Sequence, residues 1–91
     1  MKSILQKEKE CFFCGSTVWL EEHHIFGGAL RKKSERFGLK VWLCHSDHNE
    51  PPNGVHHNMA VNLKLKQIGQ KAFEEKHGHE TFMKEFYKNY V

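Results

Sequence analysis

Residues 11–28 read CFFCGSTVWLEEHHIFGG, and this stretch decides how the chain folds. Cys11 and Cys14 form a C-x-x-C pair closed by a glycine, the kind of turn in which two thiolates converge on one zinc ion. Residues 18–25 then predict a short strand, which the double glycine at 27–28 ends. We therefore expect a metal-binding turn that leads into the first strand of a small sheet.

A second strand is predicted for residues 39–43, LKVWL, where alternate aliphatic residues indicate one buried face and place Lys40 on the other. Cys44 closes this strand, and pairing of the two strands would bring it beside the C-x-x-C pair. The fourth zinc ligand is then Asp47, in a C-x-x-D spacing, or His48, in a C-x-x-x-H spacing. We favour Asp47, because that choice leaves His48 available as a ligand for a second metal ion. The alternative, three buried cysteines without metal, does not explain the C-x-x-C-G spacing.

Helices are expected in three places. Residues 29–37, ALRKKSERF, predict a one- to two-turn helix or an ordered loop that stops at Gly38. From Met59 to His77 apolar residues recur at helical spacing behind Asn58, a suitable N-cap, which predicts a helix of about four turns. Residues 80–87 predict a second amphipathic helix that folds back over the core.

The long helix has two predicted faces. The apolar face carries Val61, Leu65, Ile68, Ala72 and Phe73, and the polar side carries Lys64, Lys66, Gln67, Gln70 and Lys71. The preceding residues 45–57 are rich in Pro, Asn and Gly and predict an irregular loop.

Length and composition indicate one domain, residues 11–91, behind a flexible or weakly helical lead-in, residues 1–10, to which we assign no chemistry. Only 38% of the 91 residues are hydrophobic, so the core is thin and a zinc ion is expected to reinforce it. Three cysteines are an odd number, which favours metal binding over disulfides. No apolar run approaches the ~20 residues of a membrane span, and no signal peptide is recognisable. We expect a cytoplasmic protein without membrane contacts.

Histidine is the most unusual feature of the composition. The chain has eight, and six of them lie between residues 23 and 57. Adjacent side chains on a strand point in different directions, so His23 could bind a metal ion while His24 faces a substrate. Hydrolysis of a phosphodiester needs a base, a cation on the phosphate and neutralisation of the leaving oxygen. The hypothesis is that His24 is the base and that His23, His48 and His56 bind the ion. The reserve candidates are Glu22, Asn49 and His57.

Several segments together resemble a known family. EEHHIFGG, LKVWLC, DHN and Gly54-Val55-His56 before a helix are similar to HNH endonucleases, in particular to the phage recombination-enhancement, RecA-dependent nucleases. The likeness spans roughly residues 8–90. It implies an α+β fold, namely a small zinc-stapled ββα-metal (His-Me finger) fold with an added C-terminal helix. It also implies that His23 is a metal ligand and His24 the general base.

This sequence departs from the family pattern at two ligand positions. The first metal ligand, often Asp in the family, is His23 here, and the second structural cysteine is Asp47. Nitrogen ligands favour zinc, nickel, cobalt or manganese over magnesium, which prefers oxygen, so the catalytic metal stays open among Mg²⁺, Mn²⁺, Zn²⁺ and Ni²⁺. The middle Asn of the family name has no counterpart in residues 39–43.

The resemblance implies a metal-dependent endonuclease that nicks DNA in phage recombination. It further implies a RecA-type recombinase filament as partner, and a phage- or prophage-encoded protein in a bacterial host. A net charge of +3 suits a polyanionic partner. The best phosphate-binding candidates lie between the two strands: Arg31, Lys32, Lys33 and Arg36. The alternative is that these four residues form a solvated basic turn with no role in binding.

Two other functions compete with this one. A non-catalytic zinc-binding module that docks DNA or protein would need the C-x-x-C turn but not His24. A nicking enzyme for phage packaging or DNA invasion would share the chemistry without the recombinase. A zinc or cysteine peptidase is disfavoured, because the sequence has no H-E-x-x-H motif and its cysteines lie where zinc would hold them.

Overall fold

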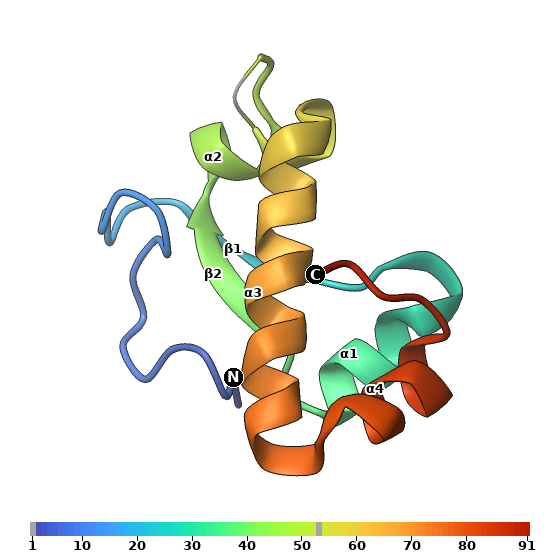
Figure 1. The fold of residues 1–91 in the computed structure, drawn as a ribbon. Helices are drawn as coiled ribbons and strands as arrows, with labels where there is room; N and C mark the ends of the chain where they lie inside the picture. The colour runs from blue at the N-terminus through green and yellow to red at the C-terminus, as the bar shows by residue number, and fades with distance from the viewer. Residues whose placement is uncertain (1, 53) are drawn as a thin grey trace.

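The computed structural model describes residues 2–52 and 54–91, which form a small α+β domain (Figure 1). Strand β1 (Leu20–His24) pairs antiparallel with β2 (Lys40–Cys44), so that Leu20 lies opposite Cys44 and His24 opposite Lys40. The helical elements are η1 (Gly28–Leu30), α1 (Arg31–Arg36), α2 (His45–Asn49), η2 (Val55–His57), α3 (Met59–His77) and α4 (His79–Phe86). The predicted α+β class and both predicted strands are confirmed.

The first strand begins later than predicted. Val18 and Trp19 are exposed and precede β1, and Trp19 has a positive φ of 50°. The indole of Trp19 stacks on the His45 ring with centroids 4.1 Å apart. The chain therefore turns at Trp19 before it enters the sheet.

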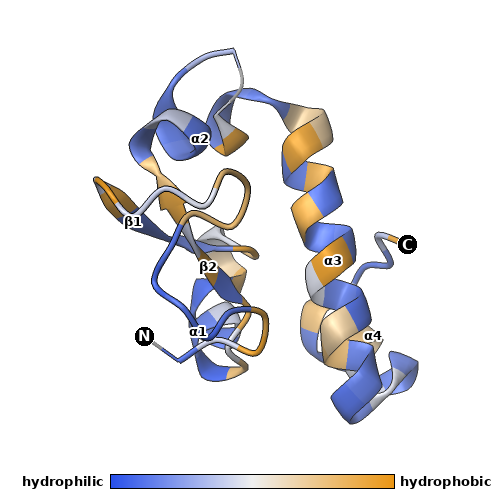
Figure 2. Ribbon diagram, turned by 90° about the vertical axis from the view of Figure 1, so that its left-hand side faces the viewer, coloured by the Kyte–Doolittle hydropathy of each residue, from blue (hydrophilic) through white to orange (hydrophobic). Residues whose placement is uncertain are grey.

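The sheet supplies one side of the core and α3 the other. Leu39, Val41 and Leu43 are fully buried, as their alternation predicted. Figure 2 shows hydrophobic residues on β2 and α3, whereas α1 and α2 are mostly hydrophilic. Gly69 lets α3 approach closely, because a Cβ there would lie 3.2 Å from Ile25 Cγ2.

The long helix begins and ends where the sequence predicted. The Asn58 side chain accepts a hydrogen bond of 3.1 Å from Val61 N, which caps α3. The helix ends at His77, and Gly78 follows with a φ of +85°. The chain then turns back into α4, which lies beside the C-terminal half of α3 (Figure 1).

Aromatic rings join α4 to the core, so the prediction that the last helix folds back is confirmed. Phe82 and Phe86 are buried, and the Phe82 centroid lies 5.6 Å from Phe73 and 5.8 Å from Phe26. Edge-to-face pairs at such separations add to the free energy gained from burying the rings.

Three expectations were wrong. Residues 45–57 are not wholly irregular, because their described part contains α2 and η2. Lys40 is only 4% exposed, although alternation placed it on the open face of its strand. Gln70, assigned to the polar side of α3, is fully buried. Its amide is satisfied there, since it donates to Asn89 Oδ1 (2.6 Å) and accepts from Tyr90 N (2.8 Å), which fastens the C-terminal segment.

Residues 2–10 contain no helix or strand and run along β2. Ile4 N donates to Gly38 O (2.9 Å), and Trp42 N donates to Gln6 Oε1 (2.7 Å). None of the helices in residues 2–52 and 54–91 is long and apolar enough to cross a membrane.

Candidate metal centres

The cysteine group consists of Cys11, Cys14, Cys44 and Asp47, whose ligand atoms all lie within 4.8 Å of one another. The first two residues come from a tight turn in which Gly15 N donates to Cys11 O (2.9 Å). Cys44 ends β2, and Asp47 lies in the first turn of α2. Asp47 Oδ2 lies 3.2 Å from Cys11 Sγ and 3.4 Å from Cys44 Sγ. Four separate positions thus converge on one point.

The donors of the cysteine group suit a metal ion. The three cysteines are free thiols, and Cys14 Sγ and Cys44 Sγ are 3.7 Å apart, well beyond the ~2.05 Å of a disulfide. Burial raises the pKa of the Cys44 thiol to about 12, because it disfavours the charged thiolate. A bound cation would reverse that effect. Three sulfurs and one carboxylate oxygen make a four-ligand set, and the group could hold a metal ion.

Asp47, rather than His48, joins the cysteines. The two residues are neighbours in α2, where successive side chains project about 100° apart, so they cannot face the same point. The structure therefore bears out Asp47 as the fourth member and frees His48 for another group.

The histidine group consists of His23, His48 and His56, which also have ligand nitrogens within 4.8 Å of one another. His23 is on β1, His48 in α2 and His56 in η2. His48 Nε2 lies 2.8 Å from His56 Nε2, and the His23 ring centroid lies 5.1 Å from that of His48. The three predicted ligands of the catalytic ion are thus brought together.

His23 gives this group its chemical character. Burial, together with the nearby His48 and His56, lowers the pKa of His23 to about 3, which keeps the imidazole neutral and able to donate a lone pair. His23 Nε2 is buried and has no hydrogen-bond partner among residues 2–52 and 54–91. An orphaned buried nitrogen is costly, and a cation shared with the other two imidazoles would satisfy it.

Glu21 orients His48 from outside the group, a role that sequence reasoning missed. Its Oε1 lies 2.8 Å from His48 Nδ1 and 2.8 Å from Asn49 Nδ2, and its Oε2 lies 3.0 Å from His45 Nδ1. Hydrogen bonds to these histidines lower the pKa of Glu21, so it is ionised and can only accept. His48 then carries its hydrogen on Nδ1 and presents the Nε2 lone pair to the group.

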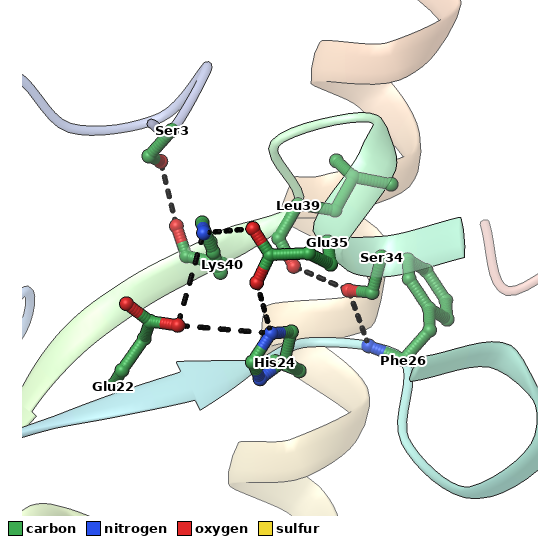
Figure 3. A network of polar contacts seen from close by, with 8 residues as sticks. All are labelled: Ser3, Glu22, His24, Phe26, Ser34, Glu35, Leu39 and Lys40. Atoms are coloured by element: carbon green, nitrogen blue, oxygen red, sulfur yellow. Dashed lines mark hydrogen bonds and ion pairs between the residues drawn. The ribbon is translucent and has the colours of Figure 1, made fainter. Parts of the chain in front are cut away.

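His24 points away from His23, as expected for neighbours on a strand, yet it opens on the same hollow. This hollow has a volume of about 380 Å³, and its lining is Glu22, His23, His24, Gly27, Gly28, Arg31, His48 and His56. His24 Nε2 lies 2.8 Å from Glu35 Oε1 (Figure 3). The predicted base and the predicted metal ligands therefore face one space.

Of the four predicted DNA contacts, Arg31 alone lines this hollow. Lys32 is exposed elsewhere on α1. Lys33 turns to α4, since its Nζ donates to Tyr87 Oη (2.8 Å) and Glu85 O (2.8 Å). The Arg36 guanidinium lies 5.0 Å from the Phe37 ring centroid. The short helix points its basic residues in several directions, which the charge run did not reveal.

The three reserve candidates take different places. Glu22 lies 3.7 Å from His24 Nε2, and Asn49 donates to Glu21. His57 is exposed and belongs to neither group, although it follows His56 directly.

Comparisons with known proteins add no relative: no family model, curated protein or solved structure matches this chain. Fold and side chains define a small α+β domain whose cysteine group could hold a metal ion.

Proposed function

We propose that this protein is a metal-dependent DNA endonuclease of the HNH (ββα-metal) type, which hydrolyses phosphodiester bonds by nicking. In this proposal the cysteine group holds a structural zinc ion and the histidine group a catalytic divalent ion. The order β1, β2 and α3 supports a ββα-metal fold, with α4 as the added helix. The observation that carries the proposal is the hollow shared by His24 and the histidine group.

The two groups differ as structural and catalytic metal sites do. The cysteine group supplies four protein ligands, whereas the histidine group supplies three and opens on a hollow. Three protein ligands leave a position for water or substrate. A divalent ion there would supply Lewis-acid polarisation of a phosphate and neutralise the leaving oxygen. The ion stays open among Zn²⁺, Ni²⁺, Mn²⁺ and Mg²⁺.

The side chains around the hollow divide the remaining work. In this proposal His24, whose Nε2 lies 2.8 Å from Glu35 Oε1, uses Nδ1 to take a proton from the attacking water. Arg31 brings a guanidinium to the same hollow, where it would bind a phosphate oxygen of the strand. The lysines of α3 would contact the phosphate backbone of the DNA, without preference for a DNA sequence.

The setting of the reaction rests on the resemblance alone. In this proposal the protein is phage- or prophage-encoded, acts in the cytoplasm of a bacterial host and cuts DNA during recombination with a RecA-type filament. A single small domain with few basic contacts would bind DNA weakly, and a filament could supply additional affinity.

The test is nicking of supercoiled plasmid by protein with one zinc ion per chain, resupplied with Mg²⁺, Mn²⁺, Ni²⁺ or Zn²⁺. We expect His24→Ala and His56→Ala to lose at least about 100-fold of the nicking rate, in line with the loss of a general base. His57→Ala is the matched control, because His57 is an exposed neighbour outside both groups.

The outcomes separate the competing functions. Loss of nicking in His24→Ala and His56→Ala, with fold and zinc content intact, supports the nuclease. If the wild type nicks with none of the metals, even with a recombinase filament added, the nuclease is refuted and the zinc-binding docking module takes its place. Equal rates in His56→Ala and His57→Ala would refute the assigned metal ligands.

A further inference from the structure

A compact polar network of Glu22, Glu35 and Lys40 surrounds His24 (Figure 3). The Glu35 carboxylate bridges the His24 imidazole and the Lys40 ammonium. Its Oε1 lies 2.8 Å from His24 Nε2, and its Oε2 accepts a hydrogen bond from Lys40 Nζ. Glu22 Oε1 lies 3.7 Å from both His24 Nε2 and Lys40 Nζ. The side chains of His24 and Lys40 are only 9% and 5% exposed.

Glu22, His24 and Glu35 have the spacing of a metal site, but the ammonium of Lys40 takes the place of a metal ion. Their ligand atoms lie within 4.8 Å of one another. The ammonium of Lys40, however, already contacts Glu35 and faces Glu22. A divalent ion among the same carboxylates would be repelled by this neighbouring charge. The network therefore acts on His24 and does not hold a third ion.

The fold places these groups through three separate elements. The strand register sets His24 opposite Lys40, so their side chains emerge together on one face of the sheet. Glu35 comes from α1, and its neighbour Ser34 ties this helix to Phe26, which follows β1, and to Leu39, which precedes β2. Phe26 N donates to Ser34 Oγ (3.2 Å), and Ser34 Oγ donates to Leu39 O.

The Glu35 carboxylate can bind the His24 imidazole only as a hydrogen-bond acceptor. Hydrogen bonds from Lys40 and His24 lower the pKa of Glu35 to about 2, so it is ionised and only accepts. The ring nitrogen that faces it must carry the hydrogen, which places the hydrogen of neutral His24 on Nε2 and the lone pair on Nδ1.

We propose that Glu35, held by the buried Lys40, is a positioning residue that fixes the ring and the Nε2–H tautomer of His24, which leaves Nδ1 as the proton acceptor. Its catalytic consequence rests on the proposed nuclease function. The tautomer itself is a property of the folded chain and is measurable without any substrate.

The first arm of the test is therefore spectroscopic. Long-range ¹H–¹⁵N correlations of the zinc-loaded protein, recorded where His24 is neutral, report which ring nitrogen carries the hydrogen. We expect an Nε2–H ring in the wild type and a mixture of tautomers in Glu35→Ala. Glu75→Ala is the matched control, since Glu75 is an exposed glutamate of α3 outside the network. Lys40→Met is a second variant that keeps the apolar stem but removes the ammonium, and it should also loosen the tautomer.

The second arm measures nicking with the metal that supports it. Glu35→Ala should lower kcat about 10- to 100-fold, as expected when the outer partner of a functional histidine is lost. KM should stay within about twofold, because Glu35 contacts no substrate in this proposal. Far-UV circular dichroism and zinc content verify that each variant is folded.

The two arms give separable results. A wild-type ring with the hydrogen on Nδ1, or the same tautomer in Glu35→Ala as in the wild type, overturns the inference whatever the nicking assay shows. A fixed Nε2–H ring that Glu35→Ala releases, in a protein that nicks no DNA, upholds the positioning and refutes the nuclease. A released ring with unchanged kcat overturns the catalytic consequence.

Discussion

The cysteine group and the histidine group are joined by two adjacent residues, because Asp47 belongs to the first and His48 to the second. They are built in different ways. Three of the four cysteine-group ligands come from a turn and a strand end, and the fourth, Asp47, comes from α2. The histidine group is oriented from outside by Glu21 and opens on a hollow. A closed four-ligand set suits a structural ion, and a supported three-ligand set suits chemistry.

The largest expected effect comes from breaking the cysteine group. Cys44→Ser should lose the proposed structural zinc and fail to fold, because apparent zinc-binding free energies of about 10–16 kcal/mol in small domains match or exceed a domain's whole stability. Circular dichroism and metal content by mass spectrometry measure both losses. His56→Ala should instead stay folded with one zinc. A folded, zinc-free Cys44→Ser would show that the cysteine group is an ordinary part of the core.

The next largest effects should come from Asp47→Ala and His48→Ala, which we expect to act on different properties of the protein. Asp47→Ala should weaken zinc binding at least ~10- to 100-fold and leave nicking intact at saturating zinc. His48→Ala should leave zinc affinity unchanged and abolish nicking. Competition with a chromophoric chelator gives the affinities, and plasmid nicking gives the rates. If His48→Ala also releases the zinc, the boundary between the two groups is drawn in the wrong place.

The smallest effect is a pH dependence that belongs to the histidine group. The folded pKa of His23, about 3, lies below its ordinary value of 6.5, so the unfolded chain binds a proton first as the pH falls. With the cysteine group loaded and the histidine group free of metal, stability should therefore decrease as the pH falls below 6.5. Between pH 7 and pH 5.5 the loss from this residue is about 1 kcal/mol.

His23→Phe keeps the ring shape without the titrating nitrogen, and urea unfolding at fixed zinc compares the two proteins. The variant should lack that part of the pH dependence. Parallel curves for His23→Phe and the wild type would contradict the assigned burial effect. Cysteine-group zinc should be monitored in the same samples, so that its release is not mistaken for titration of His23.

Elements with strong local signals were predicted well. The long helix has an N-cap at Asn58, a helical apolar pattern and a terminating Gly78, all of which act within a few residues. The α2 helix was missed, because its five residues lie in a stretch whose Pro, Asn and Gly content indicates a loop. A helix this short is stabilised mainly by contacts with the rest of the fold, not by propensity.

The sequence predicted which cysteines and histidines gather in the two groups, but not the residues that form hydrogen bonds to them. The cysteines and histidines stand out by spacing and clustering, and the structure brings them together in two groups. Glu21, Glu35 and Lys40 gave no such signal. Glu21 reaches His48 across 27 positions of sequence and Glu35 reaches His24 across 11, so only long-range packing makes them neighbours.

What the sequence determined by itself was the two strands, the long capped helix and the helix that follows it, in that order, together with the residues of metal-binding type. These features depend on interactions between residues close in the chain, such as alternation, capping and the C-x-x-C turn. The tertiary structure decided that Asp47 joins the cysteines, that Lys40 is buried and that Glu35 holds His24. These outcomes depend on strand register and on the direction in which each side chain leaves its element, which residue type alone does not encode.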